Sequence, residues 1–293
     1  MAAGADRFAG LDKGARVTRV TRGRARPFAA WAAWFDAVRL RSRWHARVRA
    51  LPLFAFLLLQ GAGIGCRPAE AAALNTDAPP PTYRTRVPST ALMRYDLRRG
   101  ILSGEGELRW QQDGRNYELR LQGTVLGMTV LSQTSRGGFD ADGLAPERFT
   151  DHRRAREPRI ADFRRDEKRI VYSGTEVQHP LPAGAQDRLS WLLQLAAIVE
   201  AEPARWRAGT HIEMAVTGAR GDMDVWTFTV TGEEAIELIG TRLARALALR
   251  REPRKPFDTR VEVWLDPARQ HLPVRMHLGS GRSDETLEFV LRP

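Results

Sequence analysis

The chain has 293 residues, and its 46 Lys and Arg residues against 35 Asp and Glu residues give a formal net charge of +11. Such a charge ordinarily indicates a nucleic-acid or anionic-membrane partner. However, residues 1–50 hold twelve basic and three acidic residues, and residues 74–293 carry a net charge of only +2. The basic character therefore belongs mainly to a leader, and we expect no nucleic-acid partner.

The strongest apolar run is residues 51–65, LPLFAFLLLQGAGIG, which follows a basic segment and precedes small residues that include Ala71 and Ala73. This is the layout of a secretory signal. Fifteen residues of helix span about 22 Å, less than the ~30 Å hydrocarbon core of a bilayer, which favours cleavage over retention as a membrane anchor. We therefore expect residues 51–73 to direct export to the periplasm, with cleavage after Ala73.

Two features of the leader leave alternatives open. Residues 1–50 exceed the usual length of a whole signal, so the start codon is either assigned too early, with initiation at Val38 or Val48, or residues 27–44 form an interfacial amphipathic helix. Cys66 follows the apolar run and is the only cysteine, so lipidation there would anchor the protein to the envelope membrane. Cleavage after Ala73 would instead leave no cysteine for a disulfide or a thiolate site.

Residues 74–84 are predicted to form a Pro-rich linker, and residues 85–293 a single β-rich domain. Asp113-Gly114 between two alternating segments is a strong hairpin signal. Apolar alternation and turn residues predict the following strands: 92–98, 106–112, 116–122, 128–135, 148–153, 159–164, 169–173, 212–216, 225–231, 235–239, 242–249, 260–265, 273–278 and 286–291.

One segment departs from this pattern. Residues 187–200, DRLSWLLQLAAIVE, begin with the N-cap candidate Asp187 and are apolar on most sides, which predicts a buried helix. The fold class is therefore mainly β: a single antiparallel barrel, half-barrel or sandwich of about a dozen strands with one buried helix.

A family resemblance rests on strand and turn signatures. These are VEVWLDP at 261–267 followed by LPVR at 272–275, together with Tyr95-Asp96 and DVWTF at 224–228. With these signatures, residues 90–292 resemble a family of proteobacterial exported proteins known as domain of unknown function 3108. The resemblance implies no activity and no catalytic residue. The strand-rich layout is also similar, at fold level, to periplasmic lipoprotein carriers of the half-barrel kind.

No catalytic constellation is evident in the sequence. The histidines after residue 74 lack the spacing of a metal pair, the serines lack a nucleophile-elbow context, and the paired acidic residues lie beside expected turns. We therefore predict no catalytic residue, no metal site and no cofactor, and expect a non-enzymatic protein.

Tryptophans are the ligand-contact candidates. Trp110, Trp226 and Trp264 lie on predicted strands and Trp191 on the predicted helix, where they either pack the core or line a cavity. The leading hypothesis is an exported envelope protein that binds or carries a lipid or another apolar ligand in this interior. An interaction scaffold with a filled core, which would use the basic segment 148–169, is the alternative, and an envelope hydrolase is the third.

Overall fold

A computed structural model describes residues 79–293 except 154–155, 255–257 and 281–282. The strands form one 15-stranded sheet in which all neighbours are antiparallel except the parallel pair β9 and β10. The first arm of the sheet is a meander of eight strands: β1 (Ala91–Arg99), β2 (Leu102–Gln112), β3 (Asn116–Val125), β4 (Met128–Asp140), β5 (Gly143–Arg153), β6 (Arg159–Arg164), β7 (Arg169–Tyr172) and β8 (Gln178–Pro180).

The second arm contains the remaining strands, with one α-helix between β9 and β10. Its strands are β9 (Gln186–Asp187), β10 (His211–Thr217), β11 (Met223–Leu238), β12 (Thr241–Arg251), β13 (Thr259–Asp266), β14 (Leu272–Ser280) and β15 (Ser283–Leu291). Two short 3₁₀ helices, η1 (Pro203–Arg205) and η2 (Pro267–Arg269), lie in connections.

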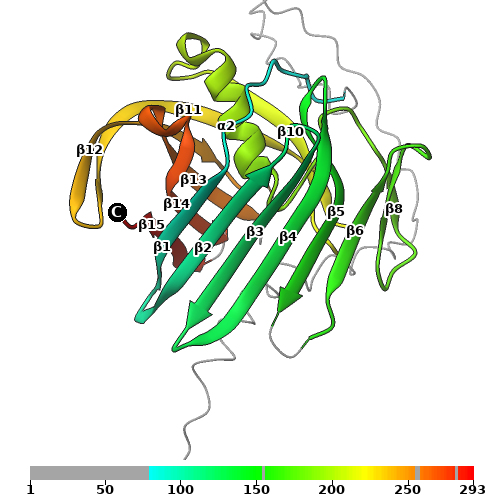
Figure 1. The fold of residues 1–293 in the computed structure, drawn as a ribbon, viewed down its shortest axis with the longest axis horizontal. Helices are drawn as coiled ribbons and strands as arrows, with labels where there is room; N and C mark the ends of the chain where they lie inside the picture. The colour runs from blue at the N-terminus through cyan, green and yellow to red at the C-terminus, as the bar shows by residue number, and fades with distance from the viewer. Residues whose placement is uncertain (1–78, 154–155, 255–257, 281–282) are drawn as a thin grey trace, which may run out of the picture.

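The two arms join where β1 pairs with β15, from Tyr95 opposite Leu291 to Arg98 opposite Glu288. The arms curve to face each other, and the helix α2 (Trp191–Ala201) lies between them (Figure 1). This is an open, half-barrel-like arrangement, so the prediction of a mainly β fold with one buried helix is confirmed.

The predicted hairpin between 106–112 and 116–122 is also confirmed. The Asp113 carboxylate accepts the backbone N–H groups of Arg115 and Asn116, which closes the turn between β2 and β3. Leu108 lies opposite Leu121 in this ladder, and both are buried on the inner face of the sheet. The alternation of the sequence therefore sets which face forms the core.

The helix begins later than predicted. It starts at Trp191 rather than Asp187, and nine of its eleven residues are buried. Asp187 belongs to the short strand β9, where its carboxylate accepts the backbone N–H groups of Leu189 and Ser190. Asp187 thus organises the entry to the helix from outside it.

The sheet also contains more strands than the dozen expected. The very short strands β8 and β9 were not predicted. By contrast, the predicted strands 225–231 and 235–239 are one strand, β11, with a register shift at Gly232. Gly232 has φ +132°, so the chain bends at this bulge without ending the strand.

The expected leader, the apolar run, Cys66, Ala71 and Ala73 all lie outside the described residues. Residues 79–90 of the expected linker and domain start form no helix or strand, and the Tyr83 ring packs against Trp206. No helix of the described ranges has the length and apolar character needed to cross a bilayer.

Candidate functional site

The structure places the four candidate tryptophans in three different environments. Trp191 of α2 and Trp226 of β11 pack together with ring centroids 5.6 Å apart. Trp110 of β2 is fully buried against Tyr117, with centroids 5.4 Å apart. Trp264 is half-buried on the face of β13 opposite the strand's buried side chains. The four rings therefore do not line one common cavity.

The helix packs the space between the arms. The side chains of Leu193, Leu195, Ala196, Ala197 and Val199 are fully buried. An all-round apolar helix in this position forms the core of the half-barrel.

A strained turn follows β13. The Asp266 carboxylate accepts the backbone N–H of Ala268 and starts η2. Gln270 and His271 then have φ values of +54° and +55°. Two consecutive residues other than glycine in the left-handed region each cost about 1–3 kcal/mol, and such strain is concentrated at functional sites.

Side-chain contacts with three other segments hold this turn. The Gln270 side-chain oxygen accepts hydrogen bonds from the backbone N–H and the hydroxyl of Ser89, at 2.9 and 2.7 Å. His271 Nδ1 lies 2.6 Å from a carboxylate oxygen of Glu200, at the end of α2. The Tyr95 hydroxyl donates to the Pro273 carbonyl at 2.7 Å. The turn is thus fixed to the N-terminal segment, to α2 and to β1.

An open groove of about 540 Å³ lies beside the turn. It forms because β1 pairs with β2 along its whole length but with β15 only from Tyr95 onward. Beyond the Tyr95–Leu291 pair, β15 ends at Leu291 and the Arg292 N–H donates to the Arg94 carbonyl at 2.8 Å, so the first residues of β1 have no strand partner on this side within the described part of the chain. Apolar walls come from Leu92, Met93, Leu272 and Leu291. Leu92 is 45% exposed, which is unusual for a large aliphatic side chain and leaves it available to a ligand.

Three arginines line the same groove: Arg94, Arg269 and Arg292. Arg292 binds the carboxylates of Asp96 and Glu105, and its hydrogen bond with Asp96 raises the pKa of the guanidinium. Within the described residues, Arg94 forms an ion pair with Glu107 and Arg269 one with Asp266, each with an N–O distance of 3.7 Å, which is beyond hydrogen-bond distance. These two guanidinium groups therefore keep donors available to an anionic group in the groove.

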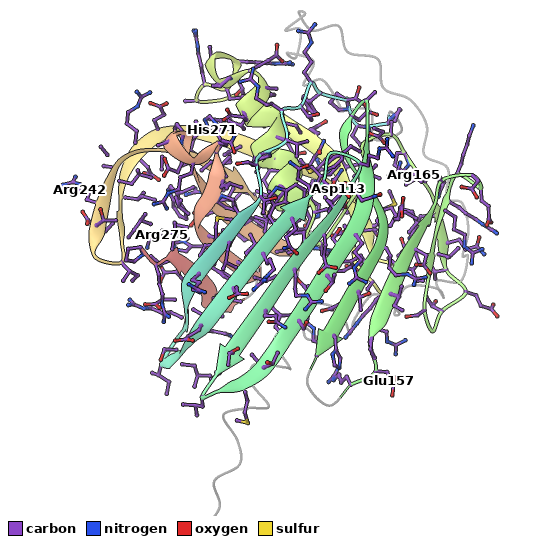
Figure 2. The ribbon with its side chains drawn as sticks, in the orientation of Figure 1. Asp113, Glu157, Arg165, Arg242, His271 and Arg275 are labelled. Carbon is purple, nitrogen blue, oxygen red and sulfur yellow. The ribbon has the colours of Figure 1, made fainter. Side chains whose placement is uncertain are left out.

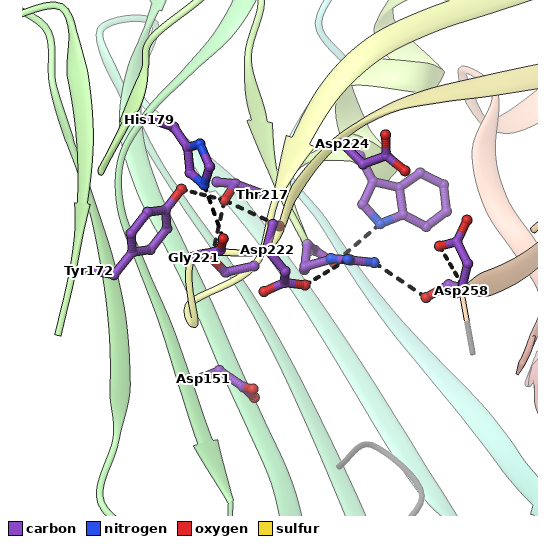
Figure 3. A network of polar contacts seen from close by, with 12 residues as sticks. Asp151, Tyr172, His179, Thr217, Gly221, Asp222, Asp224 and Asp258 are labelled. Carbon is purple, nitrogen blue, oxygen red and sulfur yellow. Dashed lines mark hydrogen bonds and ion pairs between the residues drawn. The ribbon is translucent and has the colours of Figure 1, made fainter. Parts of the chain in front are cut away.

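A second polar cluster joins the two ends of the sheet (Figure 3). The Tyr172 hydroxyl of β7 lies 2.7 Å from the Thr217 hydroxyl of β10. His179 Nε2 of β8 lies 3.0 Å from the carbonyl oxygen of Gly221, in the β10–β11 connection. Burial raises the pKa of Tyr172 to about 12, so its hydroxyl stays protonated. These side chains connect strands that share no backbone ladder.

Two arginines of this cluster pack on one indole. The guanidinium carbons of Arg251 and Arg188 lie 4.4 and 4.7 Å from the Trp226 ring centroid. Arg251 binds Asp258 at 2.8 Å, and Arg188 binds Asp222 at 2.7 Å. Burial raises the pKa of Asp258, but the hydrogen bonds from Arg251 and from backbone N–H groups outweigh it, so the pKa lies below the usual value. The carboxylates of the cluster pair its two guanidinium groups, whereas the buried Nε atoms of Arg188 and Arg251 and the Trp226 Nε1 have no hydrogen-bond partner among the described residues.

Asp187 forms a third polar element inside the fold. The Ser135 hydroxyl of β4 donates to its carboxylate at 2.5 Å, and the Tyr117 hydroxyl of β3 lies 3.0 Å from the Ser135 hydroxyl. Burial raises the pKa of Asp187 to about 6 despite these hydrogen bonds. The chain of contacts fixes the entry of α2 to the first arm.

The basic segment 148–169 lies on β5, β6 and β7 and on their connections. Arg148 pairs with Asp162 at 2.6 Å, Arg165 with Asp140 at 3.2 Å, and Arg169 with Glu167. These arginines are therefore matched by carboxylates on the same surface. The described residues contain no group of three metal-ligating side chains.

Sequence inspection missed the groove, although it singled out residues 261–267 as a family signature. The arginines of the groove are far apart in the chain and meet only because β1 pairs with β15. One signal was available. Pro267 and Pro273 enclose a tight turn with no glycine, so residues other than glycine must adopt its left-handed conformations.

Comparison with known proteins gives a family match and a structural likeness. The model of a family described as "Protein of unknown function (DUF3108)" matches residues 91–285. No curated protein matches. Among solved structures, the chain is similar to a β-barrel-like protein of domain of unknown function DUF1849 from Brucella abortus. The two are 14% identical with a TM-score of 0.45, over 71% of this chain and 97% of that chain.

Proposed function

This chain belongs to the DUF3108 family of proteins of unknown function, and we propose that it is an exported, non-enzymatic envelope protein that binds an anionic amphiphile in the groove beside η2. The observation that carries the proposal is one groove with aliphatic walls and an arginine rim. The leading hypothesis from the sequence is thereby kept, with its site moved from the interior to the junction of β1, β15 and η2.

The groove has the size and the chemistry for such a ligand. Its volume of about 540 Å³ falls within the ~300–1,000 Å³ typical of small-molecule sites. Leu92 is the exposed part of the aliphatic wall, and an acyl chain against it would remove apolar surface from water at about 25 cal/mol per Å². Arg94 and Arg269 would bind the acidic head group, since their closest carboxylate partners are too far away for hydrogen bonds.

Binding can be tested with laurate as the probe and dodecyltrimethylammonium as a cation of the same chain length. Isothermal titration calorimetry of the full chain should show binding of laurate only. Arg269→Gln should weaken laurate binding about tenfold, the effect of losing one charge-assisted contact of about 1.4 kcal/mol. Leu92→Asp should abolish binding, because it places a carboxylate in the aliphatic wall.

The matched control is Arg242→Gln in the β11–β12 hairpin, where Arg242 is also exposed (Figure 2). Its laurate affinity should equal that of the unaltered chain. Equal affinity of Leu92→Asp and the unaltered chain for laurate, or equal binding of the cationic probe, would remove the groove as the site.

The proposal of export rests on residues 51–73. Intact-mass measurement and N-terminal sequencing of protein isolated from the envelope fraction distinguish the cleaved, the lipidated and the uncleaved chain. A free N-terminus at Leu74 supports cleavage after Ala73, and a diacylglyceryl mass on Cys66 supports a lipid anchor. A chain that retains residues 51–65 supports an uncleaved anchor, and recovery only from the cytoplasm would refute export.

A second function is favoured by the packing of α2. Because the helix fills the space between the arms, the fold also suits a scaffold that presents its surface to a protein or polymer of the envelope. Cross-linking of the protein in intact cells should then trap a partner. Such a partner, together with no binding of laurate, would favour the scaffold over the ligand-binding protein.

A further inference from the structure

Two neighbouring hairpin tips expose aliphatic side chains at one end of the sheet. Ile101 lies in the two-residue loop between β1 and β2 and is fully exposed, and Leu126 lies in the two-residue loop between β3 and β4 and is 80% exposed. Because β2 pairs with β3 up to Glu105 opposite Thr124, the two loops lie side by side. Both point to the lower edge of the molecule in Figure 1.

Leu126 is unfavourable at its position for two separate reasons. Its φ is +49° and that of Gly127 is +74°, the pattern of a type I′ turn. The first central residue of such a turn is normally Asn, Asp or Gly, and a leucine there is strained. Its side chain is also 80% exposed, so packing against the described residues does not offset the strain. Together with Ile101, this leucine places two exposed aliphatic side chains on adjacent tips, and this pair is the feature from which a contact outside the chain is inferred.

The charges around the tips point to the nature of that contact. The segments 98–103 and 124–130, RRGILS and TVLGMTV, contain no acidic residue and two arginines, of which Arg99 is buried and Arg98 is exposed. Arg98 is exposed on the outer face of β1 and makes no ion pair within the described ranges. Exposed aliphatic residues next to arginine complement an anionic lipid surface, in which the aliphatic groups enter the acyl region and the cation stays among the head groups.

We propose that the Ile101 and Leu126 tips insert into an anionic lipid bilayer and hold the protein on the membrane surface by the ends of the β1–β2 and β3–β4 hairpins. This interaction surface goes beyond the groove proposed above and lies on different residues. It can therefore fail or succeed independently of laurate binding.

The test uses a fluorophore attached to single cysteines of the full chain, so that the apolar run 51–65 cannot mimic the result. Cys66→Ser is combined with Ile101→Cys, Leu126→Cys or Arg115→Cys, and each protein is labelled with nitrobenzoxadiazole. Arg115 is the control because it is exposed in the β2–β3 turn, at the other end of the same hairpins. Vesicles of phosphatidylcholine with a quarter of phosphatidylglycerol should increase and blue-shift the emission at 101 and 126 but not at 115.

A polar tip tests the contribution of the leucine. In the protein labelled at 101, Leu126→Asn should raise the vesicle concentration at half-maximal signal about tenfold, the loss expected for one buried aliphatic side chain. Asparagine suits the left-handed turn, so thermal unfolding should occur at the same temperature or higher. Absence of a shift at both tips, or an equal shift at 115, would overturn the proposal. A shift that follows protein concentration without vesicles would instead show self-association and would also overturn it.

Discussion

At the scale of single residues, Asp187 links folding to pH. Burial raises its pKa from 3.8 to about 6, so between these values the folded state keeps a proton that the unfolded chain has lost. The contribution of this group to stability is therefore greatest below about pH 4, decreases as pH rises to about 6 and is constant above it. The carboxylate is retained because it accepts the backbone N–H groups that start α2.

Asp187→Asn should separate the charge from the hydrogen bonds. The amide oxygen can still accept the Leu189 and Ser190 N–H groups, and the amide carries no charge at any pH. We expect the stability of the variant relative to the unaltered chain to rise by about 2–3 kcal/mol from pH 4 to pH 7, at about 1.4 kcal/mol for each pKa unit. Urea unfolding at a series of pH values measures this difference.

Asp113→Asn is the control, because its stability relative to the unaltered chain should change with pH in the opposite direction. The pKa of Asp113 is lowered by the backbone N–H groups of Asn116 and Arg115, so this exposed group stabilises the fold above its unfolded pKa, and that contribution is lost as pH falls. Its variant should therefore lose stability relative to the unaltered chain as pH rises. A difference for Asp187→Asn that does not change with pH would show that the buried carboxyl titrates as it does in the unfolded chain.

The candidate site depends on contacts between distant segments, which the sequence alone does not predict. The turn signature at 264–267 was recognised, but the contacts of Gln270 with Ser89 and of His271 with Glu200 join residues far apart in the chain. Leu92 was predicted to lie on a strand, yet its exposure depends on where β15 stops pairing with β1. Spacing within a segment predicts local faces, whereas a groove between segments requires their pairing.

At the scale of elements, the sequence predicted long amphipathic strands better than short or interrupted ones. The hairpin of β2 and β3 follows from alternation and from Asp113-Gly114. The strands β8 and β9 are too short to show an alternation of apolar and polar residues. They form because adjacent strands supply hydrogen-bond partners. The sequence predicts two strands in place of β11 because Gly232 interrupts the alternation. In the structure the ladder with β12 continues across the bulge.

The helix α2 offers a direct test of whether the interior is filled. The Ala196 side chain is fully buried between the arms. Ala196→Leu should therefore destabilise the protein by about 1–3 kcal/mol, the usual effect of overpacking a filled core. Guanidinium unfolding measures the change.

Ala91→Leu is a suitable control, because Ala91 lines the open groove and is only partly buried. It should change stability by less than about 0.5 kcal/mol. Unchanged or increased stability of Ala196→Leu would indicate space beside the helix. The hypothesis of an interior ligand cavity would then be favoured over the groove.

At the scale of the whole molecule, two kinds of contact join the arms of the half-barrel: a backbone ladder at the centre of the sheet and side-chain hydrogen bonds at its outer ends. The centre is a backbone ladder between β1 and β15, whose strands come from the two ends of the folded domain. The outer ends of the sheet meet through side chains: Tyr172 contacts Thr217, His179 contacts Gly221, and Asp187 and Gln186 of β9 form hydrogen bonds with Ser135 and the Leu144 carbonyl of the first arm. Because a backbone ladder has several cooperative hydrogen bonds and the outer contacts are separate side-chain hydrogen bonds, the outer ends should open first.

Tyr172→Phe and Thr217→Val remove the two hydroxyls of one outer contact while keeping the volume of each side chain nearly unchanged. A double-mutant cycle should give a coupling energy of about 1 kcal/mol, the net contribution of one buried hydrogen bond. Hydrogen exchange should become faster in β7, β8 and β10 and remain unchanged in β1 and β15, because the central ladder does not depend on this contact. Additive effects of the two substitutions, or equal loss of protection in β1, would mean that the arms are held together elsewhere and that the sheet opens as one unit.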